Sequence, residues 1–311
     1  MHVLVPFASA LSDAAAQTLR DLQLPLLTKL LSLLAPTARV GDDEYSLTPP
    51  HERALADALG LSGGDGCIPW AARQAQRDGI DTGDRAWGLL TPAHWVVGGE
   101  QVTLLDPAAL NLADAESREH LEAIRSLFES EGFTLTYGAP LRWYAAHDSL
   151  DRLPAASLDR VIGRSVDLWL ASRAESRLVR RLQNEVQMLL YQHPTHDARV
   201  ARGELPINSF WLSGCGRMQP EPSNAADIVV DERLRAPLLA EDWGAWTEAW
   251  RALDAEMMGP LVERAQRGEA VALTLCGERS AQRFEPTPRS WWQRFVSSGR
   301  GTAPHTILEA L

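Results

Sequence analysis

The sequence predicts an α/β protein, with a mostly parallel sheet flanked by helices and a smaller α+β domain. A short apolar segment typical of a buried parallel strand lies near the start of the chain, at residues 3–7. Between residues 87 and 147 the predicted order is instead hairpin, helix, strand and strand. A chain of 311 residues is long enough for two such domains.

The first quarter of the chain predicts one strand followed by helices. Val3–Phe7 (VLVPF) is short and apolar, and we expect it to open the parallel sheet. Leu19–Leu34 carries leucines at helical spacing and predicts one long helix. Shorter helices are predicted at His51–Leu59 and Ile68–Asp78. Gly60–Asp65 predicts a flexible turn, because it lacks the Lys-Ser/Thr of a P-loop and the GxGxxG spacing of a dinucleotide fold.

The middle of the chain predicts the α+β domain. Trp87–Leu105 alternates apolar residues around Gly98-Gly99, as in a β-hairpin. Ala115–Gly132 has the periodicity of an amphipathic helix. Phe133–Tyr137 and Leu141–His147 then predict two further strands.

The most informative stretch is Leu178–Gly216. Its first part, Arg177–Gln192, has apolar residues at helical spacing and a polar opposite face, which predicts an amphipathic helix. His193-Pro194 is expected to end this helix, because proline disfavours helical geometry in the residue before it. A short basic segment follows, and Ile207–Leu212 predicts an apolar strand. The glycines of Gly214-Cys215-Gly216 let the backbone turn tightly or approach a ligand.

The last third of the chain completes the predicted core. Ile228–Val230 and Ala270–Leu275 predict strands, and Glu241–Gly268 predicts a helix. The aromatic segment Ser290–Phe295 is expected to dock on the body of the protein.

The informative stretch resembles the insert-domain signature of the archaeal-type, cofactor-independent phosphoglycerate mutases of the alkaline phosphatase superfamily. In that family an Asn-bearing helix leads into His-Pro-x-Asn, a basic run ending in Gly, Pro-x-Asn, a strand and Gly-x-Gly. This chain matches the signature at His193-Pro194, Arg199, Gly203, Pro206, Asn208 and Gly214-x-Gly216. It departs from it at His196 and Ser213, where the family has Asn and Arg. The chain also resembles a bacterial group labelled Rpf-type regulatory proteins.

The mutase resemblance implies an alkaline-phosphatase-like core at residues 1–80 and 218–311, with an insert-like α+β domain at residues 81–217. It also implies where metal ligands belong, and this chain lacks them there. After the first strand the family has Asp-Gly, whereas this chain has Pro6-Phe7-Ala8. The ligands before a later helix are replaced by Trp-Gly-Ala-Trp, and those after the last strand by Cys276–Ser280.

These replacements bear directly on catalysis. Phosphoryl transfer in the superfamily needs two divalent ions, because they neutralise charge on the phosphoryl oxygens. Such hard cations need charged oxygen ligands. We therefore predict no catalytic residue, no metal site and no cofactor, and interpret the chain as a non-catalytic regulatory or ligand-binding protein derived from the mutase fold.

A binding role has candidate residues around the insert-like region. Guanidinium groups suit phosphate and carboxylate, so a small phosphorylated or carboxylated metabolite is the predicted ligand. The simpler alternative for the arginines is surface salt bridges. The candidate ligand-binding residues are Arg142, Arg164, His193, Arg199, Arg202 and Asn208.

Two alternative functions remain open at this point. One is an active phosphoglycerate mutase or phosphatase whose metal ligands come from Asp13, Asp242, Asp254 and Glu278. The other is a protein-interaction scaffold that binds a partner through Trp243, Trp246 and Trp250, which helical spacing places on one face. Core packing is the commoner role of such an aromatic stripe.

Composition limits the partners and the compartment. A net charge of −11 argues against a surface for nucleic acid or anionic membranes. No segment is long and apolar enough for a membrane helix, and the N-terminus lacks the basic region of a signal peptide. Three widely spaced cysteines form no metal-binding pattern and suit a reducing compartment. We expect a cytoplasmic protein.

Overall fold

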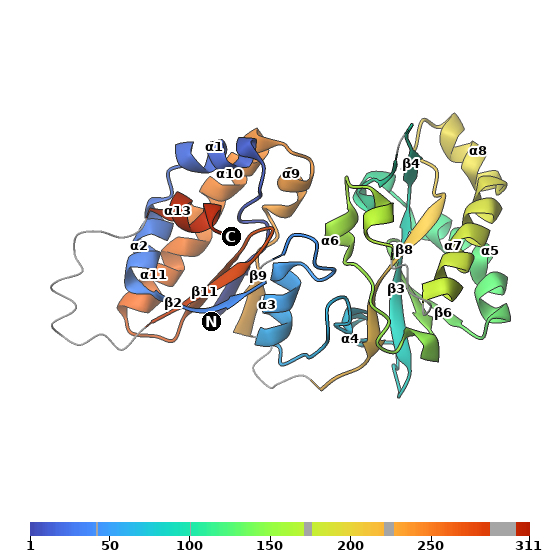
Figure 1. Cartoon of the computed structure of the whole chain (residues 1–311), viewed down its shortest axis with the longest axis horizontal. Helices are drawn as coiled ribbons and strands as arrows, with labels where there is room; N and C mark the ends of the chain where they lie inside the picture. Colours follow the sequence, from blue (N-terminus) through green and yellow to red (C-terminus); the bar gives the residue numbers. More distant parts are fainter. Residues whose placement is uncertain (42, 100, 171–175, 221–226, 287–302) are drawn as a thin grey trace. The chain divides into compact units, whose positions relative to one another are not determined.

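The structure is a computed structural model, and it describes residues 1–41, 43–99, 101–170, 176–220, 227–286 and 303–311 (Figure 1). By its internal contacts the chain forms two compact units. Unit 1 comprises Met1–Tyr45, Pro49–Gly60 and Glu221–Leu311, and unit 2 comprises Ser46–Thr48 and Leu61–Pro220. The division that we predicted lies at residues 80/81 and 217/218. The predicted aromatic segment Ser290–Phe295 lies outside the described residues.

Unit 1 contains a five-stranded sheet. Its strands are β1 (His2–Val5), β2 (Ala35–Val40), β9 (Ile228–Val230), β10 (Ala272–Cys276) and β11 (Ala281–Glu285). The spatial order is β2-β11-β10-β1-β9. β1 pairs in parallel with both β9 and β10, and β11 pairs antiparallel with β10 and β2. The predicted α/β class is confirmed, and the sheet that we expected to be mostly parallel has two parallel and two antiparallel strand pairings.

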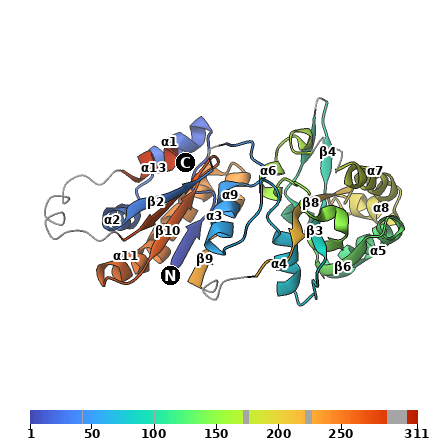
Figure 2. The ribbon, with the colours of Figure 1, turned by 60° about the horizontal axis from the view of Figure 1, so that its bottom comes forward.

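Helices cover both faces of this sheet (Figure 2). Val3 and Val5 of β1 lie in the main core of the unit, whereas Leu4 lies in a smaller cluster with Ala54. This alternation follows from the two-residue period of a strand. The helical segments are α1 (Asp13–Asp21), α2 (Pro25–Leu33), α3 (Pro50–Ala58), α9 (Arg235–Leu239), α10 (Trp243–Leu253), a π-helical segment (Asp254–Met258), α11 (Gly259–Gln266) and α13 (Pro304–Glu309).

The prediction of one helix over Leu19–Leu34 is wrong. The chain leaves helical geometry after Asp21 and starts α2 at Pro25. Proline lacks the backbone N–H that a helix interior needs, but it is well tolerated in the first turn. The leucine periodicity therefore continues across two helices rather than one.

The tryptophan stripe of α10 belongs to the core. Trp246 and Trp250 are fully buried, and their ring centroids lie 6.3 Å apart. Both rings pack with the leucines and valines of the unit 1 core. The predicted partner-binding face of Trp243, Trp246 and Trp250 is thus wrong, because two of the three rings are inaccessible.

Unit 2 contains a four-stranded antiparallel sheet and a two-stranded hairpin. The sheet has the order β6-β7-β3-β8, and β4 pairs with β5. The predicted hairpin over Trp87–Leu105 is therefore shorter than expected: only β4 and β5 form it, around Gly98-Gly99. β3 is buried almost throughout and pairs with β7 and β8 instead. The strands are β3 (Ala86–Ala93), β4 (Trp95–Val97), β5 (Val102–Leu104), β6 (Thr134–Ala139), β7 (Arg142–Ala146) and β8 (Ser209–Arg217).

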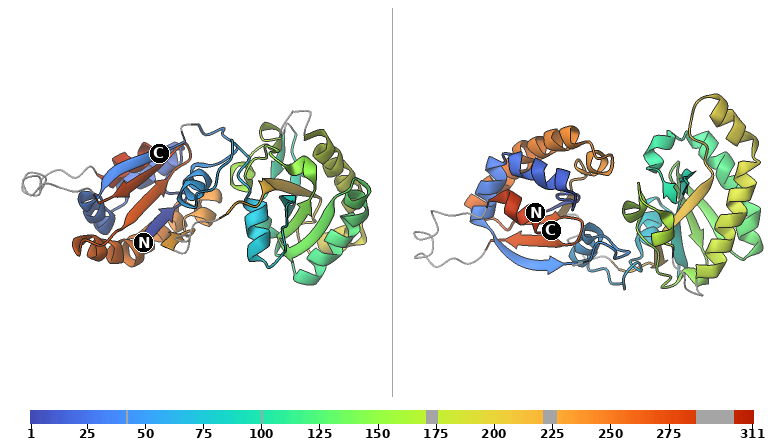
Figure 3. Two further views of the ribbon diagram at one scale, coloured as in Figure 1. Left: turned by 90° about the horizontal axis from the view of Figure 1, so that it is seen from below. Right: turned by 45° about the horizontal axis from the view of Figure 1, so that its top comes forward.

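Helices pack on both faces of the four-stranded sheet (Figure 3). Trp143 faces the core formed with two long helices, whereas its neighbour Tyr144 lies in the cluster formed with α4. The long amphipathic helices predicted in this unit are confirmed as α5 and α7. The helical segments are α4 (Trp70–Arg77), η1 (Pro107–Leu110), α5 (Asp114–Ser130), η2 (Asp148–Leu150), α6 (Leu158–Val161), η3 (Val166–Leu168), α7 (Arg177–Tyr191) and α8 (Pro194–Ala201).

The basic segment after His193-Pro194 forms a helix that the sequence did not predict. Pro194 occupies the first turn of α8, and the imidazole of His193 accepts a hydrogen bond from the backbone N–H of Thr195. His193 is thus an N-cap, so the same dipeptide ends α7 and starts α8.

None of the helices formed by the described residues has both the length and the apolar character needed to cross a bilayer. The cytoplasmic location stays a prediction.

Candidate ligand-binding site

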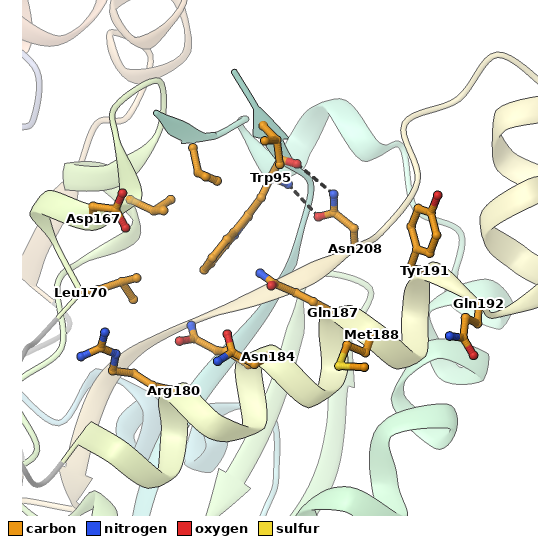
Figure 4. Close-up of a pocket in the computed structure, with 14 residues that line it drawn as sticks. Trp95, Asp167, Leu170, Arg180, Asn184, Gln187, Met188, Tyr191, Gln192 and Asn208 are labelled. Carbon is orange, nitrogen blue, oxygen red and sulfur yellow. Dashed lines mark hydrogen bonds between the residues drawn. The ribbon is translucent and has the colours of Figure 1, made fainter. Parts of the chain in front are cut away.

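Unit 2 carries a cavity of about 570 Å³ beside α7, which we call the α7 pocket (Figure 4). Its lining comes from β4, β5, residues 166–170, α7, Gln192 and Asn208. Cavities of this volume hold small organic molecules. The segments that form it are distant in sequence, so only the tertiary structure brings them together.

The polar face of α7 forms one side of the pocket. Arg180, Asn184, Gln187 and Tyr191 lie at helical spacing and line the cavity along about 16 Å of helix. The opposite face of α7 carries buried apolar residues, among them Leu182 and Val186, that pack in the unit 2 core. The amphipathic pattern of α7 therefore fixes which side chains face the cavity.

The facing side of the pocket is built on Trp95 and Asn208. The Trp95 backbone N–H donates to Asn208 Oδ1 (2.8 Å), and Asn208 Nδ2 donates to the Trp95 carbonyl (2.8 Å). The Asn208 side chain thereby replaces a neighbouring strand at the edge of β4. The Trp95 indole is largely buried, and its Nε1 has no hydrogen-bond partner among the described residues. Asn208 thus positions Trp95 within the pocket.

Two opposite charges lie at one end of the α7 pocket. The close-up places Asp167 and Arg180 on either side of Leu170, while Tyr191 and Gln192 lie at the far end (Figure 4). Both charged residues are exposed, and neither side chain makes a hydrogen bond or ion pair with any described residue. Within the described part of the chain, both side-chain charges at this end of the pocket are therefore unpaired.

Exposed apolar side chains also line the pocket. Val97, Met188 and Tyr191 line the pocket and are 80%, 69% and 71% exposed. Leu168 lies beside the pocket residue Asp167 and is 67% exposed. Clusters of exposed apolar residues at a cavity are typical of binding sites.

Three of the predicted binding residues make ion pairs or hydrogen bonds in a network elsewhere, between α5 and α8. Arg199 Nη1 lies 2.6 Å from Glu116 Oε2, and Arg202 Nη2 lies 3.0 Å from Glu116 Oε1. His193 Nδ1 lies 2.7 Å from Thr195 Oγ1, which lies 2.9 Å from His120 Nε2. Burial lowers the pKa of His120. The network connects two helices and does not line the α7 pocket.

The two remaining arginines lie apart from this network. Arg142 donates two hydrogen bonds of 3.1 Å to Asp78, which also accepts from the Tyr144 hydroxyl (2.7 Å). Partial burial opposes ionisation of Asp78, but the hydrogen bonds from Tyr144 and Arg142 outweigh it and lower the pKa of Asp78. The Arg164 guanidinium lies 5.9 Å from the centre of the Trp169 ring, in cation–π geometry.

Of the six predicted binding residues, only Asn208 lines the α7 pocket. Ligand binding by the other five stays a prediction. Sequence reasoning missed Asp167, Arg180, Asn184 and Gln187. The polar face of α7 was visible in the sequence, but nothing local distinguished a polar face that lines a cavity from one that faces solvent.

The glycines of Gly214-Cys215-Gly216 serve packing within β8. Gly214 has φ +64°, and an added Cβ would lie 2.9 Å from the Ala71 nitrogen of α4. The close approach anticipated from these glycines is therefore to a helix rather than to a bound molecule.

Most of the carboxylates proposed as alternative metal ligands have structural roles in unit 1. Asp254 accepts hydrogen bonds from the backbone N–H groups of Leu26 (3.1 Å) and Leu27 (2.6 Å) at the start of α2. Asp242 caps α10, and Glu278 accepts from the Leu11 N–H (3.1 Å). Asp13 lies exposed in the first turn of α1. Among the described residues, no three His, Cys, Asp or Glu side chains gather as a metal site would require.

Sequence comparison supports the mutase resemblance over part of the chain. A probable 2,3-bisphosphoglycerate-independent phosphoglycerate mutase of Geobacter sulfurreducens is 28% identical over 116 residues, which cover 36% of this chain and 28% of that protein. The match thus spans well under half of either protein. No family model matches the chain. The resemblance to these mutases is confirmed at this level.

Two solved structures are similar to this chain at lower sequence identity. The cofactor-independent phosphoglycerate mutase of Thermoplasma acidophilum aligns over 92% of this chain and 90% of its own, with 14% identity and a TM-score of 0.37. The PH0037 protein of Pyrococcus horikoshii aligns over 92% and 87%, with 11% identity and a TM-score of 0.44.

Proposed function

We propose that this protein is a non-catalytic, regulatory binding protein derived from a phosphoglycerate-mutase-like ancestor, and that it holds a small anionic metabolite in the α7 pocket. The observation that carries the proposal is Arg180, a guanidinium at a preformed pocket with no ion-pair partner among the described residues. A phosphorylated or carboxylated ligand would supply that partner.

The pocket lining supports binding of a polar molecule. Asn184 and Gln187 offer amide donors and acceptors beside Arg180, and Trp95 offers an aromatic surface. The paired hydrogen bonds between Asn208 and the Trp95 backbone hold the pocket wall in place before a ligand arrives. Such preorganisation lowers the entropic cost of binding.

The absence of catalysis is proposed from the roles of the residues in unit 1. The carboxylates of Asp254 and Asp242 already accept backbone hydrogen bonds at helix starts. Where the mutase resemblance places metal ligands, the chain reads Pro6-Phe7-Ala8 after β1 and Cys276–Ser280 from the last residue of β10 onwards. Burial raises the pKa of the Cys276 thiol, which disfavours the thiolate.

A thermal-shift screen of phosphorylated and carboxylated metabolites tests the binding role. Ligand binding raises the melting temperature, and Arg180→Gln should abolish that rise. Arg181→Gln is the matched control: it removes the same charge from α7, but Arg181 pairs with Glu131 (2.6 Å) outside the pocket. A ligand-induced rise that survives Arg180→Gln would refute this role for the α7 pocket.

The competing enzyme hypothesis is tested in parallel by mutase and phosphatase assays with added Mn²⁺. Metal-dependent turnover that disappears in an Asp254→Asn or Asp242→Asn variant, with the fold preserved, would overturn the non-catalytic proposal. No turnover with intact ligand binding is the expected result.

A further inference from the structure

We infer that the ligand of the α7 pocket is a zwitterion with an apolar body, the chemistry of an amino acid or short peptide. The inference rests on the proposed binding function of this pocket. It assigns Arg180 to the carboxylate of the ligand and Asp167 to its ammonium group.

The first argument is the relation between the two charges. Asp167 and Arg180 line the same end of one cavity, yet they form no ion pair with each other. Leu170 lies between them (Figure 4). A ligand with an ammonium and a carboxylate complements both groups, whereas a dianionic phosphate would be repelled by Asp167.

The second argument is the chemistry of the polar side chains between the charged end and the far end. Asn184 and Gln187 carry neutral amides, which both donate and accept hydrogen bonds. Gln187 Nε2 donates to Ser209 Oγ (3.3 Å), so its carbonyl oxygen remains for a ligand donor. Amide side chains match the N–H and C=O groups of a peptide unit, and they add no further positive charge for a phosphate.

The third argument is the apolar rim. Val97, Met188 and Tyr191 form this rim: they line the pocket, and most of their surface is exposed. Methionine adapts its shape to different apolar groups, and tyrosine combines an apolar ring with a polar tip. An aliphatic or aromatic ligand side chain would cover this rim and stabilise the complex by burying it.

The test compares ligands that differ by one charge. Calorimetric titration would use the standard amino acids, unblocked di- and tripeptides of leucine, and the N-acetylated and C-amidated form of each ligand that binds. We expect an unblocked compound to bind and each blocking group to weaken binding at least about tenfold, because each removes one charge-assisted hydrogen bond. Whether a free amino acid or a short peptide binds shows which of the two classes is the ligand.

Variants assign each charge to its residue. In Asp167→Asn, N-acetylation of the ligand should no longer weaken binding. In Arg180→Gln, C-amidation of the ligand should no longer weaken binding. Arg181→Gln and Glu185→Gln are the matched controls, since these residues form an ion pair on α7 away from the pocket. Both control variants should still bind the N-acetylated and the C-amidated compounds more weakly than the unblocked ligand.

The outcomes distinguish this inference from the proposed function. One contrary outcome is binding that is lost in Arg180→Gln and yet is unaffected by N-acetylation of the ligand and by Asp167→Asn. That result would overturn the inference of a zwitterionic ligand and leave an anion-binding protein. If neither zwitterions nor the phosphorylated and carboxylated metabolites bind, the α7 pocket is not a ligand site and both proposals fail.

Discussion

Arginine side chains in this protein differ in whether a neighbour already neutralises them. Arg199 is almost fully buried, pairs with Glu116 and donates to the backbone carbonyls of Leu110 and Leu205. Arg180 is exposed at a pocket and has no such partner among the described residues. The same residue type therefore serves stability at one position and is available for recognition at the other.

Replacing Arg199 should strongly destabilise unit 2. Arg199→Met leaves the Glu116 carboxylate and two backbone carbonyls without their shared donor, and breaking such a buried pair costs about 3–5 kcal/mol. Urea unfolding followed by circular dichroism measures the change. The control is Arg202→Met, whose exposed guanidinium also contacts Glu116 and should matter much less. Equal losses in the two variants would contradict this account.

The protein should lose stability in mild acid through His2. Burial and the nearby Arg283 lower the pKa of His2 from 6.5 to about 4. Because the folded state binds the proton less readily, this contribution is fully present above pH 6.5 and is lost as the pH falls towards 4. His2→Gln should flatten the dependence of the unfolding free energy on pH across that range. The control is His305→Gln in α13, and an unchanged slope in His2→Gln would refute the assignment.

Elements in unit 2 meet at positions where only certain residues fit. The strand β8 passes so close to α4 that Gly214 has no room for a side chain. Asn208, just before β8, forms two side-chain hydrogen bonds with the backbone of Trp95 in β4. Both contacts position elements around the sheet, and both can be tested by single substitutions.

Gly214→Ala should destabilise the protein by more than backbone strain alone. Its Cβ would lie 2.9 Å from Ala71 N and from Trp70 Cβ, so β8 and α4 would have to separate. Gly79→Ala is the matched control, because Gly79 also has a positive φ (+79°) but nothing within 4 Å of an added Cβ. The control should cost about 1–2 kcal/mol, the usual strain of the left-handed region. Equal midpoints of denaturant unfolding would contradict the packing argument.

Asn208→Ala should loosen the wall of the α7 pocket. It leaves the Trp95 N–H and carbonyl without partners, a loss of about 1–3 kcal/mol for a buried backbone group. We expect a lower melting temperature together with weaker binding of any ligand found in the screen. Asn208→Asp keeps the acceptor for the Trp95 N–H and should recover part of both. If binding is unchanged in Asn208→Ala, Asn208 does not position the pocket.

Each of the two units has its own hydrophobic core. We expect neither core to need a bound metal. In unit 1, the Asp254 carboxylate already has hydrogen-bond donors from the backbone. Burial raises the pKa of this carboxyl against the opposing effect of the hydrogen bonds from Leu27 and Leu26. Its two oxygens face backbone N–H groups at the start of α2, where the helix dipole favours negative charge.

Chelation should therefore leave the molecule unchanged. We expect the melting temperature of protein treated with EDTA to equal that of protein supplied with Mn²⁺, because a bound metal would stabilise the folded state in proportion to its affinity. Differential scanning calorimetry of both samples measures this. A higher melting temperature with Mn²⁺ that is lost in Asp254→Asn would restore the metal-dependent hypothesis.

Much of the secondary structure followed from local sequence patterns. Helical periodicity correctly identified α5 and α7, and short apolar runs identified the strands of the parallel pairing in unit 1. The predicted single helix over Leu19–Leu34 was wrong because Pro25 starts a second helix. The predicted hairpin was too long because β3 pairs with β7 and β8 instead. Turn chemistry and periodicity are local, so the sequence contains them directly.

The site depended on contacts that are not local. Sequence identified the resemblance to the mutases, the acidic composition and Asn208, but it could not show that Glu116 neutralises Arg199 and Arg202. It also could not bring Trp95, Asp167 and Arg180 to one cavity. Whether a charged side chain is paired or available depends on which distant segments pack beside it, and the tertiary structure alone decides that packing.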